Sequence, residues 1–313
     1  MKRAAIVLAI LIIALLEIVS ISPACASDNP LDLLKKSEAA EQNISYRGLK
    51  FADINIGRRV IRAHFKIVHK KPNCTRTEYF RPSELAGIVV IEKNEDYWRF
   101  LPSQGHWQHN KWELAPQRIN LALRNYKVTQ AGRDVVAGRQ AHVIKLTPRK
   151  RGNPSETVWI DTVYHLVLKN ELKNSSGTTI SVSAFRQIIF EPGNITDAAF
   201  AVPKNVRTPH NPVTDLGFTV VKPKYMPKGY SFVQTTSVPV GNDVYAAHLM
   251  YTNGINTISV FERKAGGKNS GDWKSGFGSI ANMVHFSHGQ VTFTIIGDIA
   301  KRELQRIADS LKK

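Results

Sequence analysis

The stretch Ile61-Arg62-Ala63-His64-Phe65-Lys66-Ile67 decides the fold of this chain, because apolar and polar side chains alternate along it. Successive side chains of a β-strand point to opposite faces of a sheet, so this alternation places apolar groups on one face and polar groups on the other. The stretch therefore predicts a half-buried strand in a sheet that must cover one of its faces.

The sequence that follows this strand indicates an extended antiparallel sheet. Residues 85–91 and 97–101 flank Lys93-Asn94-Glu95-Asp96, which is typical of a hairpin. Gly- and Asn-rich turns separate further predicted strands at 127–130, 140–147, 156–161, 165–172 and 179–190. Such a sheet has few helices to bury it. We expect either that helices cap one face, or that the sheet curls into a partial barrel around a cavity.

Three amphipathic helices are predicted from apolar spacing. The first covers residues 29–41, with Asn29 as its cap, and the second covers residues 112–125. The third covers residues 298–311, with Asp298 as its N-cap, and its apolar stripe is expected to pack on a second sheet. We therefore expect an α+β fold in which most strands are antiparallel.

A Pro- and Asn-rich segment divides the chain into two domains. Residues 203–212 contain three prolines and two asparagines, which is typical of a linker. The predicted division is a signal peptide at 1–26, a first domain at 27–203, a linker at 204–213 and a second domain at 214–313. We predict that the two domains reorient about this linker.

The first residues have the pattern of a Sec signal peptide. Lys2 and Arg3 precede an apolar run, and Ala24-Cys25-Ala26 offers a small-residue cleavage site. An uncleaved anchor and a lipidated Cys25 are the alternatives. Cleavage after Ala26 would leave Cys74 as the single thiol, so the mature chain would have no internal disulfide.

The chain is strongly basic. It has 43 basic and 25 acidic residues, a net charge of +18, which attracts nucleic acid, anionic lipid or acidic protein. Export argues against nucleic acid as a partner. The cluster Arg149-Lys150-Arg151 lies in a turn rich in Pro, Gly and Asn, where it is either a solvated hairpin tip or a contact for phosphate or lipid headgroups.

Motifs of catalysis and cofactor binding are missing from the sequence. It has no Gly-x-Ser-x-Gly elbow, Walker loop or dinucleotide fingerprint. The pairs His106/His109 and His285/His288 have metal-ligand spacing, but they fall in turn-rich stretches with no third ligand nearby. We predict a protein that is not an enzyme, with no catalytic residue, no metal site and no cofactor.

Several short motifs occur along both predicted domains. Those of the first domain are Arg76–Pro82, Gly87–Val90, Tyr97–Pro102, Tyr126–Val128, Val136–Arg139 and Trp159–Asp161. Those of the second domain are Pro223–Phe232, Tyr251–Glu262 and Val291–Gly297. The two sets resemble the N-terminal and C-terminal domains of the RseB/MucB family of periplasmic sigma-factor regulators. Together they cover nearly all of the chain after the signal segment, in the order that the family has them.

The resemblance implies a fold and a function. The fold would be an unclosed β-barrel with helices around an apolar cavity, like the lipoprotein carriers LolA and LolB, followed by a smaller α+β domain. The protein would bind the periplasmic domain of a membrane anti-sigma factor and shield it from proteolysis. Lipid, lipoprotein or lipopolysaccharide in the cavity would release it. The alternative is a periplasmic lipid or lipoprotein carrier, which would not need the second domain.

Nine apolar residues on the predicted inward face of the curled sheet are candidates for lining such a cavity. They are Ile61, Phe65, Ile67, Val89, Trp98, Phe100, Ile144, Trp159 and Leu168. Cavity-lining and core residues look alike in a sequence, so an ordinary core remains the alternative for each of them.

Overall fold

The computed structural model of the chain describes residues 29–56, 59–103, 105–111, 118–202, 206, 213, 216–241, 244–265 and 282–312. The predicted signal peptide lies outside these residues. So do most of the predicted linker and residues 112–117 of the second predicted helix.

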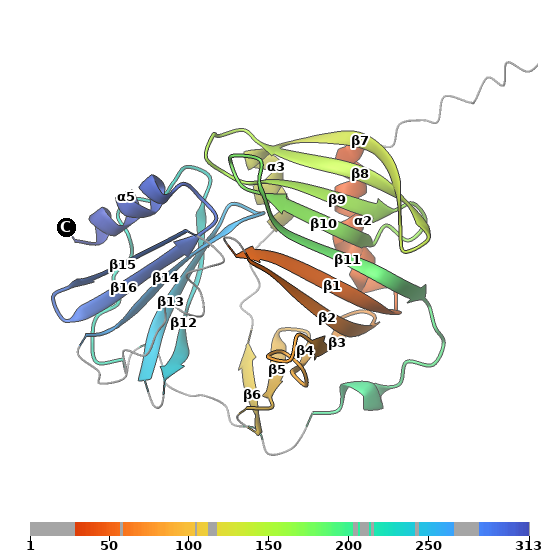
Figure 1. Cartoon of the computed structure of the whole chain (residues 1–313), viewed down its shortest axis with the longest axis horizontal. Coiled ribbons are helices and arrows are strands. Elements are labelled where there is room, and N and C mark those ends of the chain that lie inside the picture. The colour runs from red at the N-terminus through yellow and green to blue at the C-terminus, as the bar shows by residue number, and fades with distance from the viewer. Residues whose placement is uncertain are drawn as a thin grey trace, which may run out of the picture.

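Eleven strands form one antiparallel sheet in the first unit (Figure 1). They are β1 (Tyr46–Ile56), β2 (Arg59–Lys70), β3 (Cys74–Arg81), β4 (Val89–Lys93), β5 (Asp96–Leu101), β6 (His106–Lys111), β7 (Tyr126–Val136), β8 (Arg139–Pro148), β9 (Ser155–Asp161), β10 (Val167–Lys173) and β11 (Thr179–Phe190). Their spatial order is β6-β5-β4-β3-β2-β1-β11-β10-β9-β8-β7, so β1 pairs with β11 and the sheet has two free edges. The prediction of an α+β, mostly antiparallel and unclosed sheet is confirmed.

The stretch that predicted the fold is the centre of β2. Ala63 and Phe65 are buried, whereas Arg62 and Lys66 on the alternate positions are exposed. β2 pairs with β1 from Tyr46 opposite His69 to Ile56 opposite Arg59. Period two therefore identified both the strand and its buried side.

Two helices lie on one face of this sheet, which we call the helix face. α2 (Pro30–Asn43) begins where Oδ1 of Asn29 accepts from the N–H of Leu31 at 3.0 Å, as predicted. Leu33 and Leu34 of α2 pack on Ile144 and its neighbours. α3 (Arg118–Asn125) lies beside α2 near β7.

The opposite face, which we call the outer face, is covered locally by a short 3₁₀ helix, η1 (Asp197–Phe200). Nη1 of Arg76 on β3 donates to the carbonyl of Ala199 at 3.3 Å. Phe200 is 1% exposed, and Nζ of Lys70 lies 2.7 Å from Asp197. The segment that leaves β11 therefore returns across β3.

The second unit is a five-stranded antiparallel sheet with one helix (Figure 1). Its order is β12-β13-β14-β16-β15, formed by β12 (Ser231–Gly241), β13 (Val244–Thr252), β14 (Thr257–Lys264), β15 (Asn282–His288) and β16 (Val291–Gly297). α5 (Lys301–Leu311) packs Leu304 and Ile307 on this sheet, as predicted.

The predicted N-cap of α5 was wrong. The cap position is Ala300, which offers no side-chain hydrogen bond, and the helix begins three residues after Asp298. Burial instead raises the pKa of the Asp298 carboxyl to about 6. A buried carboxyl is favoured in its neutral form, which explains this direction.

Candidate functional site

The turn between β13 and β14 joins the second unit to the first. Asn253 in this turn is 1% exposed, and its Nδ2 donates to the Tyr126 hydroxyl at 3.0 Å. Nδ2 of Asn125 donates in the other direction, to the backbone carbonyls of Gly229 and Asn253 at 2.9 and 3.0 Å. Buried polar groups that lose such partners cannot turn to water, so these bonds favour one arrangement of the two units.

The same turn is held in shape by its own hydrogen bonds. Oδ1 of Asn253 accepts from the N–H groups of Ile255 and Asn256, at 3.0 and 2.8 Å. Nδ2 of Asn256 donates to the Tyr230 hydroxyl at 2.9 Å. An Asn side chain that binds the backbone ahead of it forms an Asx turn. The turn presents Ile255 to the core cluster that contains Tyr126.

A cavity of about 390 Å³, which we call the junction cavity, lies where this turn meets the helices. Its apolar lining includes Leu34 of α2, Ile119 of α3 and Val158 of β9 in the first unit, and Ile255 in the second. Its carboxylates are Glu38, Glu41 and Glu156. Apolar walls with a few polar groups are typical of small-ligand sites of this size.

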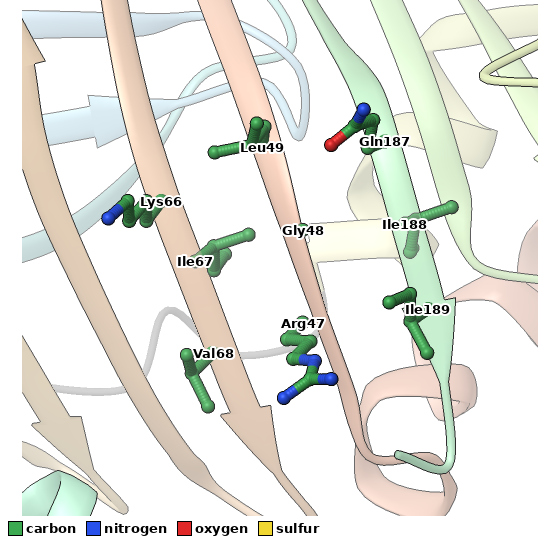
Figure 2. Close-up of a pocket in the computed structure, with 9 residues that line it drawn as sticks. All are labelled: Arg47, Gly48, Leu49, Lys66, Ile67, Val68, Gln187, Ile188 and Ile189. Atoms are coloured by element: carbon green, nitrogen blue, oxygen red, sulfur yellow. The ribbon is translucent and has the colours of Figure 1, made fainter.

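A second hollow, of about 240 Å³, which we call the outer groove, lies on β1, β2 and β11 (Figure 2). By strand register, six of its lining residues share the outer face: Arg47, Leu49, Lys66, Val68, Gln187 and Ile189. Ile189 is 51% exposed. The outer groove is thus an open hollow on a sheet face, with two cations at its sides.

Gly48 lies at the centre of the outer groove, and its own side-chain position faces the helix side. A Cβ there would lie 2.9 Å from the Phe185 ring and would also press against the backbone carbonyl of Gln187. The close approach of these groups therefore requires glycine at this position.

Three of the predicted cavity residues, Ile61, Phe65 and Ile67, lie on the helix face of β2. They share it with Tyr46, whose hydroxyl donates to Glu41 of α2 at 3.1 Å. Ile61 is 38% exposed at the far end of the strand, while Phe65 is 9% exposed.

Three others, Val89, Trp98 and Phe100, lie on the outer face. Register places Ile67 beside Thr77, and Thr77 beside Val90, so the adjacent residue Val89 points to the opposite side with Phe100. Phe100 packs on Trp107 with ring centroids 5.5 Å apart, and Trp98 stacks on His109 at 4.8 Å. The nine candidates therefore do not share one face.

The last three, Ile144, Trp159 and Leu168, are buried in the core. Ile144 and Leu168 are 0% exposed. The Trp159 indole N–H donates to Asp134 at 2.9 Å, and Nζ of Lys169 lies 3.9 Å above its ring. These side chains are surrounded by protein atoms in this arrangement, and contact of any of the nine with a ligand remains a prediction.

Burial shifts the pKa values of two further titratable groups, Lys50 and Glu262. Burial lowers the pKa of the Lys50 ammonium, against the opposite effect of Glu41, and Nζ lies 4.7 Å from the centre of the Phe185 ring. Burial raises the pKa of Glu262 to about 7, although its Oε2 accepts from the N–H of Val221 at 3.0 Å. The other oxygen of Glu262 has no hydrogen-bond partner among the described residues.

The two histidine pairs lie in strands and not in turns, so that part of the prediction was wrong. Residues three apart in a strand point to opposite faces, which separates the members of each pair. His109 Nε2 lies 2.6 Å from Asp96 on β5, and His285 Nδ1 lies 2.8 Å from the Thr294 hydroxyl. Within the ranges that the structure describes, no three His, Cys, Asp or Glu side chains form a group that could hold a metal ion.

Among the described helices, none is both long and apolar enough to cross a membrane. The burial of the Asn253-Gly254 turn between the two units could not be predicted from the sequence. The Asn-Gly pair indicates a turn, whereas its partners Asn125 and Tyr126 are more than a hundred positions away. The sequence held no signal for that contact.

Both halves of the chain match models of one protein family. The model of the MucB/RseB N-terminal domain matches residues 29–205, and that of the MucB/RseB C-terminal domain matches residues 217–312. The chain is 26% identical over 245 residues to the sigma-E factor regulatory protein RseB of Salmonella typhimurium, covering 75% of this chain and 70% of that protein. It is 21% identical over 294 residues to RseB of Escherichia coli K12, covering 90% and 89%.

Solved structures of MucB show the same fold. MucB alone has a TM-score of 0.65 at 18% identity, over 91% of this chain and 98% of that chain. MucB in the complex of Pseudomonas aeruginosa MucA and MucB has a TM-score of 0.64 at 19% identity, over 89% and 96%. The two-sheet architecture is therefore shared, although most residues differ.

Proposed function

Because this chain belongs to the MucB/RseB family, we propose that it is a periplasmic regulator that binds the periplasmic domain of a membrane anti-sigma factor. Bound there, it shields the anti-sigma factor from proteolysis and so restrains an envelope-stress response. The observation that carries the proposal is that both family domains match, in order, on one chain. Two relatives are named as sigma-E regulators, and MucB has been solved in complex with MucA.

We further propose that the junction cavity receives an apolar chain from a lipid, a lipoprotein or the lipid portion of lipopolysaccharide. The support is its position. Leu34, Ile119 and Val158 line it from the first unit, and Ile255 lines it from the second. A chain that enters beside Ile255 competes with the contact that places this residue on the core of the first unit.

Ligand entry would thereby favour a second arrangement of the two domains. A ligand shifts such an equilibrium only as far as it binds one arrangement better than the other. The contacts of Ile255 and Asn253 belong to the arrangement of the two units described above. Small-angle scattering should therefore show a change of envelope when an acylated peptide is added. One rigid envelope with and without the peptide would contradict this step.

The function is tested by capture from solubilised envelope with the tagged mature chain, before and after addition of acylated peptide. Capture of a single-span anti-sigma protein, lost on addition of the peptide, would support the regulator. Capture of lipids or lipoproteins alone would favour the alternative, a carrier. An Ile255→Ser variant separates the two steps. It should still capture the partner, while the peptide concentration that releases the partner should differ from that of the wild type.

A further inference from the structure

The basic cluster at the β8–β9 turn lies against the second domain. Lys150 and Arg151 line a cleft of about 290 Å³, together with Lys228 before β12 and Arg306 of α5. The cleft thus collects cations from both domains, although they are far apart in the sequence. From the sequence, this cluster could be either a solvated hairpin tip or an anion contact. In the structure, Lys150 and Arg151 lie beside cations of the second domain.

Hydrogen bonds between the domains fix the position of this turn. The N–H of Arg149 donates to the carbonyl of Asn125 at 2.8 Å, and the Asn125 side chain donates to the carbonyl of Gly229. The Tyr230 hydroxyl donates to Oδ1 of Asn153 at 3.4 Å. The backbone beside Lys150 and Arg151 is therefore tied to the backbone beside Lys228.

The charges in the cleft are not balanced. Nη1 of Arg306 lies 3.3 Å from Glu303, and the guanidinium lies 4.0 Å above the Tyr225 ring. Lys150, Arg151 and Lys228 are exposed, and among the described residues they form no ion pair. One acidic side chain, Glu303, lines the cleft with four cations, so the net charge of the lining groups is positive.

We propose that this cleft binds a phosphate group and that the bound group bridges the two domains. Phosphate carries about −1.5 to −2 charges near neutral pH, which matches three uncompensated cations better than a single carboxylate does. Arg151 can bind two phosphate oxygens at once, while Lys150 and Lys228 act as point charges. A cleft of about 290 Å³ has room for a compact group such as phosphate, but not for the whole of an extended acidic peptide. The inference requires neither the anti-sigma partner nor an apolar ligand.

The probe is inorganic pyrophosphate, titrated calorimetrically into the mature full-length chain at low salt. Lys150→Gln combined with Arg151→Gln should weaken binding by about tenfold or more, because the loss of even one charge-assisted hydrogen bond costs roughly that factor. Lys228→Gln alone should weaken it too, although it lies in the other domain. The matched control is Lys35→Gln with Lys36→Gln, an equal loss of charge on exposed positions of α2, which should leave affinity within about twofold.

Vesicles separate the two sources of the phosphate group. Binding to phosphatidic acid vesicles, lost in the Lys150→Gln/Arg151→Gln variant, indicates a lipid headgroup. Binding of pyrophosphate without vesicle binding indicates a soluble phosphate, and both outcomes support the site. Three results would overturn it: no saturable binding of pyrophosphate, an equal loss in the α2 control, or tighter binding of a hexaglutamate peptide than of pyrophosphate. Circular dichroism of each variant shows whether it is folded.

Discussion

Replacing Asn253 by alanine removes three hydrogen bonds at the domain junction. The N–H groups of Ile255 and Asn256 lose their acceptor, and the Tyr126 hydroxyl loses its donor. Asn256 and Tyr126 are 4% and 1% exposed, so water does not readily replace the lost partners. A buried polar group left unpaired costs about 1–3 kcal/mol, so the two buried groups, on Asn256 and Tyr126, together give roughly 4 kcal/mol for the substitution.

The chain offers a matched control in Asn174, which forms the same kind of turn in solvent. Its Oδ1 accepts from the N–H groups of Ser176 and Thr178, at 3.0 and 2.9 Å, and these bonds are exposed. Asn174→Ala should cost only about 1 kcal/mol, because water can take over the freed N–H groups. The difference between the two variants isolates the contribution of burial between the domains.

The assay is urea unfolding followed by circular dichroism, with both variants and the wild type measured under the same conditions. If Asn253→Ala is no more destabilising than Asn174→Ala, the junction does not hold the domains together.

Three further outcomes are expected. Because the pKa of Glu262 is raised to about 7 by burial, its ionisation opposes folding, so stability should fall as pH rises from about 4.5 to 7. Glu262→Gln should remove this slope and exceed the wild type by up to about 3 kcal/mol at pH 8 in thermal or urea unfolding; an unchanged slope would refute it. Gly48→Ala should cost about 1–3 kcal/mol in urea unfolding, because the new methyl group presses on Phe185 and on the backbone of Gln187. Ile144→Ala should cost about 2–5 kcal/mol in the same measurement, since this side chain is 0% exposed; a smaller loss would indicate that its surroundings are not close-packed.

Local patterns in the sequence predicted most of the first sheet, because alternation and turn residues are local signals. β2 and the β4–β5 hairpin follow directly from them. The faces of different strands relative to one another could not be predicted in this way. Alternation assigns the residues within one strand to two faces. Only the pairing between strands shows that Val89 and Ile67 lie on different faces of the sheet.

The junction, and the cleft lined by Lys150, Arg151 and Lys228, were harder to predict for a related reason. Asn253, Tyr126 and Lys228 are ordinary residues of turns and strands in the sequence, and their roles depend on contacts between domains. The Arg149-Lys150-Arg151 cluster was visible as a charge run, but its neighbour in the second domain was not.

The central proposal is partner binding, and titration calorimetry tests it most directly. The purified mature chain is titrated with the purified periplasmic domain of the membrane anti-sigma factor encoded in the same genome. A saturable complex that weakens when acylated peptide is added is the predicted result. No detectable heat of binding at concentrations of about 10–100 µM, with both proteins folded, would contradict the proposal, because regulation by capture requires the complex to form.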